Sequence, residues 1–125
     1  MSVVRRVAQL FGVGFLILGG AGLYYGHSLD DGILWDRFPV NLVGNLVHVL
    51  FGAWGVAAAA TFSGAKSYCQ LVGIICVALA GIGYVTPTLG IMPIGGADIW
   101  LHGGVGLILT YAGFTAREGA GLTAL

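Results

Sequence analysis

Two histidines inside uncharged, apolar stretches are the residues of this sequence best suited to chemistry. His48 and His102 are each followed four residues later by a glycine, Gly52 and Gly106. An ionisable side chain within an apolar span is costly, and such a residue by default marks a functional site. Imidazole nitrogens also bind haem iron and small metal ions. The two histidines therefore define the candidate site.

Four roles are open for this pair. The two rings could bind a haem iron from both sides. Each ring could bind the magnesium of a chlorophyll-type pigment, with the following glycine leaving space for the macrocycle. They could hold a small metal ion, although a stable site usually has more than two ligands. Finally, they could brace a helix bundle by hydrogen bonding to neighbouring helices and polar residues.

Bracing is the favoured role, because suitable polar partners are already in the sequence. Asn45 lies three residues before His48, which is one helical turn. Asp98 lies four residues before His102, again one turn away. A larger ligand set is not visible around either histidine.

The other reactive residue types suggest no enzyme. His27 lies near Asp30 and Asp31 and is expected in a solvated loop. Cys69 and Cys76 are seven residues apart, which is not a metal-binding spacing, and we expect both to be reduced and buried. No phosphate-binding loop, nucleophile elbow or zinc-protease motif is present. The sequence therefore predicts a non-enzymatic protein.

The composition requires a lipid environment. Of 125 residues, 58% are hydrophobic and only 8% are charged, and the formal net charge is zero. A soluble domain usually carries about 25% charged residues. Disordered chains need low hydrophobicity, and nucleic-acid binding needs a basic surface, so both classes are excluded. We therefore expect an integral membrane protein with no nucleic-acid partner.

Charged residues divide the chain into four apolar runs. We predict transmembrane helices at Val7–Tyr24, Asn41–Phe62, Tyr68–Tyr84 and Ile99–Ala116. Each run is close to the length of about 20 residues that a bilayer requires. Asn41 and Asp98 are the predicted N-caps of the second and fourth helices. The predicted fold is an all-α, integral membrane four-helix bundle in a single domain.

Tyrosines and tryptophans lie near the ends of these runs. Interfacial aromatic side chains commonly occupy such positions. Tyr68 and Tyr84, at the two ends of the third helix, are accordingly predicted to lie at the membrane surfaces.

An internal repeat divides the bundle into two tandem helical hairpins. Val13-Gly14 in the first run matches Val72-Gly73 in the third, and Ala21-Gly22 matches Ala80-Gly81 at the same offset. The His48 and Gly52 pair similarly matches His102 and Gly106. Parallel repeats of this kind are known in membrane proteins.

Glycine is abundant, with 23 residues, and recurs at helical spacing within the runs. In lipid, helices associate through close packing of small residues. The predicted packing positions are Gly12, Gly19, Gly52, Gly55, Gly106 and Gly113. Both histidines share this spacing, so we expect them to face other helices rather than lipid. The same glycine-rich surfaces would suit a homo-oligomer or a larger membrane complex.

The positive charges predict the orientation. Arg5, Arg6, Lys66 and Arg117 fall on one side of a four-span protein, and Arg37 falls on the other. By the positive-inside rule, both termini are then cytoplasmic.

Two motifs resemble a known bacterial family. The run Gly96-Ala97-Asp98-Ile99-Trp100-Leu101-His102 and the earlier pattern Asn45-x-x-His48-x-x-x-Gly52-x-x-Gly55 are similar to a family of small four-helix membrane proteins. That family is catalogued as a domain of unknown function. The resemblance implies four helices and a setting in the bacterial inner (plasma) membrane or the thylakoid membrane. It implies no activity.

Together these features predict a structural or accessory subunit of a membrane complex. The first alternative is a subunit that binds haem or chlorophyll through His48 and His102, in a photosynthetic or respiratory complex. The second alternative is a small channel or transporter, which would need a polar lumen.

Overall fold

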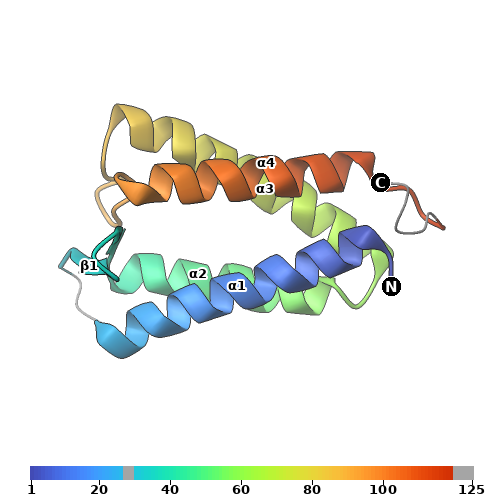
Figure 1. Ribbon diagram of the computed structural model, residues 1–125, viewed down its shortest axis with the longest axis horizontal. Helices are drawn as coiled ribbons and strands as arrows, with labels where there is room; N and C mark the ends of the chain where they lie inside the picture. The colour runs from blue at the N-terminus through green and yellow to red at the C-terminus, as the bar shows by residue number, and fades with distance from the viewer. Residues whose placement is uncertain (27–29, 120–125) are drawn as a thin grey trace.

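The chain forms four helices and a small β-hairpin in a computed structural model, which describes residues 1–26 and 30–119 (Figure 1). The elements are α1 (Val3–Tyr25), β1 (Gly32–Leu34), β2 (Phe38–Val40), α2 (Leu42–Ala58), α3 (Phe62–Val85) and α4 (Ala97–Thr115). The helical class and the four helices are as predicted. Two of them, α1 and α3, are long and apolar enough to cross a membrane, and α2 is a shorter apolar helix.

The boundary between α2 and α3 differs from the prediction. The second helix ends at Ala58 rather than Phe62, and the third begins at Phe62 rather than Tyr68. Thr61 is the N-cap of α3, and its side chain accepts a hydrogen bond from the Gly64 N–H at 3.0 Å. The predicted boundary rests on Lys66, whose charge indicates a break between spans. A charged residue can instead lie within the first turns of a helix.

The helices pack as two antiparallel hairpins. In Figure 1, α1 lies along α2, and α3 lies along α4. The start of α1 and the end of α4 lie at one end of the bundle. The β-hairpin lies at the other end, where β1 and β2 pair antiparallel with Ile33 opposite Pro39.

The two hairpins repeat one another, but in a different register from the predicted one. Buried positions of α1 recur 61 residues later in α3: Val4 and Ala65, Ala8 and Cys69, Gly12 and Gly73, Phe15 and Cys76, Gly22 and Gly83. The match of Gly14 to Gly73, 59 residues apart, was therefore wrong. Gly14 faces open space, whereas a Cβ on Gly73 would lie 2.6 Å from the Thr110 backbone nitrogen. Small residues are so frequent in α1 and α3 that the two sequences can be aligned in more than one register.

Helices α2 and α4 repeat with an offset of 54 residues. Their buried positions correspond as His48 and His102, Gly52 and Gly106, and Gly55 and Leu109. The contacts between helices correspond as well. Gly19 packs against Val49 in the first hairpin, and the equivalent Ala80 packs against Gly103 in the second.

The predicted packing glycines lie at close helix contacts. The set comprises Gly12, Gly19, Gly52, Gly55, Gly106 and Gly113, and an added Cβ at each would approach a neighbouring atom to 2.7 Å or less. Gly12 lies against Gly52 and Gly55, which brings α1 and α2 together. Only a residue without a side chain permits backbones to approach this closely.

Two equivalent cations cap the helices at one end of the bundle. Arg5 donates from Nε to the Ala59 carbonyl at 2.8 Å and from Nη2 to the Ala60 carbonyl at 2.9 Å, at the end of α2. Lys66, 61 residues later, donates to the Ala116 carbonyl at 2.9 Å, at the end of α4. Cations stabilise helix C-termini because the last carbonyls there lack partners. Both positively charged side chains at this end therefore make hydrogen bonds that hold helix ends together.

The caps at the opposite end were predicted in part. Asn41 caps α2, because its side chain accepts a hydrogen bond from the Gly44 N–H at 2.9 Å. Asp98 does not cap α4; the N-cap is Gly96, with a φ of 61° that favours glycine, and Asp98 lies in the first turn of the helix. The β-hairpin itself was not predicted from the sequence.

Candidate functional site

The structure brings His48 of α2 and His102 of α4 together. Their ring centroids are 6.1 Å apart, with the ring planes inclined at 46°. Only 6% of His48 and 3% of His102 is exposed. Because these residues are equivalent in the two repeats, the pair lies where one hairpin meets the other. A residue from each half therefore contributes to one buried site.

The expected bracing hydrogen bonds do not form among the described residues. The Nδ1 atom of each histidine is buried and has no hydrogen-bond partner. Asn45 turns towards α1 instead, where its side chain lies against Gly22 and donates to the Gly26 carbonyl at 3.2 Å. Helical spacing brings these residues to one face of α2, but the packing of α1 sets the direction of the amide.

Asp98 also lies near the site without bonding His102. The residue is 2% exposed, and its Oδ1 atom is buried without a partner. It lies one turn before His102 on the buried side of α4. The region thus contains one buried carboxyl group and two buried imidazoles, each with a polar atom that makes no hydrogen bond.

Phe15 covers one side of the histidine pair. Its ring stacks on His48 with centroids 5.7 Å apart and planes inclined at 24°, and it meets Phe51 edge-on at 5.7 Å. The equivalent position in the second hairpin is Cys76, a buried free thiol. The site is therefore asymmetric although its two histidines are equivalent. Phe15 could not be identified from the sequence, since an aromatic residue in an apolar helix carries no local signal.

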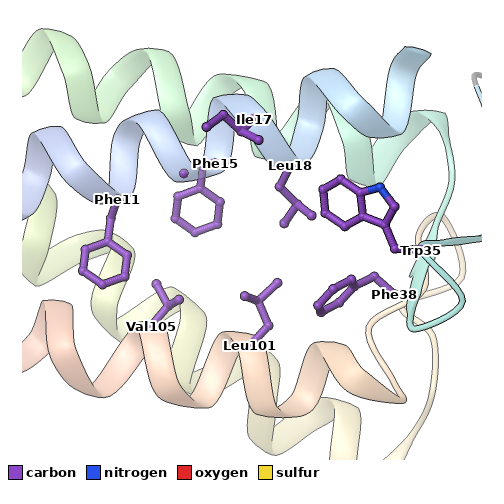
Figure 2. A pocket seen from close by; sticks show the side chains of 9 residues that line it. Phe11, Phe15, Ile17, Leu18, Trp35, Phe38, Leu101 and Val105 are labelled. Carbon is purple, nitrogen blue, oxygen red and sulfur yellow. The ribbon is translucent and has the colours of Figure 1, made fainter. Parts of the chain in front are cut away.

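An apolar groove of about 310 Å³ lies on the other side of Phe15. In Figure 2, α1 supplies Phe11, Phe15, Ile17 and Leu18, and α4 supplies Leu101 and Val105. Trp35 and Phe38 of the β-hairpin close one end. Trp35 has a φ of 53°, which is unusual for a bulky residue, and this conformation places its indole at the groove. Phe15 thus stands between the groove and His48.

The structure does not leave space for a haem or chlorophyll ring at the two glycines that follow the histidines. The glycines expected to leave room for a macrocycle are used for helix packing. An added Cβ at Gly52 would lie 2.6 Å from the Leu16 backbone nitrogen, and one at Gly106 would lie 2.7 Å from that of Val77. Both positions are therefore filled by the neighbouring helix.

The other candidate residues lie apart from this pair. Across residues 1–26 and 30–119, no group of three or more His, Cys, Asp or Glu side chains could hold a metal ion. Cys69 and Cys76 are buried and free, as expected. His27 lies outside the described residues.

A comparison with protein families gives one match. The family model described as Domain of unknown function (DUF4383) matches residues 5–115, a range that includes both histidines. No curated protein and no solved structure matches the chain.

Proposed function

We propose that this chain, which belongs to the family Domain of unknown function (DUF4383), is a non-enzymatic integral membrane protein that serves as an accessory or structural subunit. The observation that carries the proposal is the outer surface of its helices. Large apolar side chains are exposed there, among them Leu10, Ile17, Leu50, Leu71, Ile74, Leu107, Ile108 and Phe114. Soluble monomers rarely expose contiguous apolar patches of this extent, whereas lipid covers them at no cost.

All four helices are proposed to cross the bilayer. Helix α2 has 17 residues and α4 has 19. At about 1.5 Å per residue these helices are about 26 and 29 Å long, close to a hydrocarbon thickness of about 30 Å. We place the protein in a bacterial inner membrane or a thylakoid membrane, in agreement with its family resemblance.

We predict that both termini are cytoplasmic, because Arg5 and Lys66 lie at the end of the bundle where α1 begins. Single cysteines at Ser2 and Ser63 should react with an impermeant maleimide only after the membrane is opened, in a background in which Cys69 and Cys76 are alanine. A cysteine at Ile33, in the exposed part of β1, should react in intact cells. Labelling of Ser2 and Ile33 from the same side would contradict this orientation.

Contacts with other subunits are proposed at a second set of glycines. Gly20 and Gly81 occupy equivalent positions 61 residues apart, and both are exposed with no atom within 4 Å of an added Cβ. These glycines give α1 and α3 flat outer faces that another transmembrane helix can approach closely. The glycines inside the bundle are already used by the chain's own helices.

We predict that the protein purifies from a mild detergent as a homo-oligomer or with partner subunits. Gly20→Leu and Gly81→Leu should each shift native mass spectra or chemical crosslinking towards the monomer, because a leucine prevents close approach. Gly104→Leu is the matched control, since Gly104 also faces open space but lies on α4. A monomeric wild-type protein, or assemblies unaffected by both leucines, would contradict the proposal.

A further inference from the structure

We propose that His48 and His102 together bind one monovalent copper ion, Cu(I), at the contact between the two hairpins.

The separation of the rings suits a single bridging ion. Two imidazoles that bind one ion through metal–nitrogen bonds of about 2.0 Å have centroids about 6.2 Å apart, because each nitrogen lies about 1.1 Å from its centroid. The observed separation of His48 and His102 is 6.1 Å. The centroid separation therefore matches that of two imidazoles bound to one ion.

The missing hydrogen bonds favour binding of an ion, because an ion could satisfy the unpaired nitrogens. The Nδ1 atoms of both histidines are buried and unpaired. A buried polar atom without a partner usually costs about 1–3 kcal/mol. One metal ion between the rings would give each imidazole a bond and remove both costs.

The ligand count selects the kind of ion. Among the described residues the two histidines have no third His, Cys, Asp or Glu side chain with which to form a metal-binding group. Zinc in proteins is almost always bound by four ligands. Cu(I) has a filled d shell, accepts imidazole ligands and is stable with two ligands in a line.

The apolar surroundings of the site also favour a monovalent ion. Asp98 lies one turn from His102, is 2% exposed and has a carboxyl oxygen without a hydrogen-bond partner. A monovalent ion brings less charge into such an apolar, buried surrounding than a divalent ion does. Phe15 stacks on His48 and separates the pair from the apolar groove.

The test uses the full chain in mild detergent without oxygen, with Cys69→Ala and Cys76→Ala so that thiols cannot bind copper. Cu(I) is titrated against the chromophoric chelator bicinchoninate. We expect one ion per chain, and His48→Leu and His102→Leu should each weaken the affinity by about 100-fold or more, since loss of even an outer-shell partner costs 10–100-fold. Gly104→Ala is the control, because an added Cβ there meets nothing within 4 Å, and this variant should bind Cu(I) as before.

X-ray absorption of the copper-loaded protein keeps the proposal testable if a histidine variant fails to fold. We expect two nitrogen ligands and no sulfur when the wild-type cysteines are present. Absence of Cu(I) binding, binding that survives both leucine substitutions, or a four-coordinate spectrum would overturn the proposal. A two-coordinate Cu(I) site in a protein that stays monomeric and has no partners would support this inference while refuting the proposed subunit role.

Discussion

Gly52→Ala and Gly106→Ala should each lower the free energy of unfolding by about 2–3 kcal/mol, because overpacking of a tight contact usually costs about 1–3 kcal/mol. The added methyl group would meet backbone atoms, which cannot move aside as a side chain can. At Gly52 it would lie 2.6 Å from the Leu16 nitrogen, and at Gly106 it would lie 2.7 Å from the Val77 nitrogen. Unfolding by sodium dodecyl sulfate in mixed micelles, followed by circular dichroism, measures this change.

Gly104→Ala is the matched control on the same helix as Gly106. An added Cβ at Gly104 meets nothing within 4 Å, so only the helix propensity changes. Alanine is favoured over glycine within a helix by about 1 kcal/mol, and this variant should be as stable as the wild type or more stable. Equal losses at Gly104 and Gly106 would show that the helices do not approach as closely as the structure indicates.

The helices were predictable because each one is a segment with its own apolar composition, bounded by charged or capping residues. Apolar runs bracketed by charge locate α1 and α4 closely, and Asn41 marks the start of α2 through its side-chain oxygen. The sequence also predicted in part that His48 and His102 lie close together, since both share the spacing of the packing glycines and should face other helices. These predictions use the residue types and spacing of one helix at a time.

Two features of how the helices pack together were not predictable. The register of the repeat was wrong, because Gly14 and Gly73 match as letters while only Gly73 touches another helix. The hydrogen bond expected between Asn45 and His48 does not form, since the Asn45 amide turns towards the Gly26 carbonyl. The β-hairpin escaped prediction for a different reason: its turn places Trp35 at positive φ, where bulky residues are uncommon.

The predicted place of Tyr68 at the membrane surface, together with Tyr84, is wrong. The structure buries Tyr68 completely, at 0% exposure, between α2 and α3. Its hydroxyl donates to the Phe51 carbonyl at 2.9 Å, and its ring meets Trp54 edge-on with centroids 5.3 Å apart. One side chain of the second hairpin thus packs against the middle of the first.

We therefore expect Tyr68→Ala to lower the free energy of unfolding by about 3–5 kcal/mol, as removal of a large buried ring does. Tyr68→Phe keeps the ring and removes only one hydrogen bond, so it should cost about 1 kcal/mol. Tyr84→Ala is the matched control because 84% of Tyr84 is exposed, and it should have little effect in the same micelles. Similar losses for Tyr68→Ala and Tyr84→Ala would contradict the burial of Tyr68 and its contact with the first hairpin.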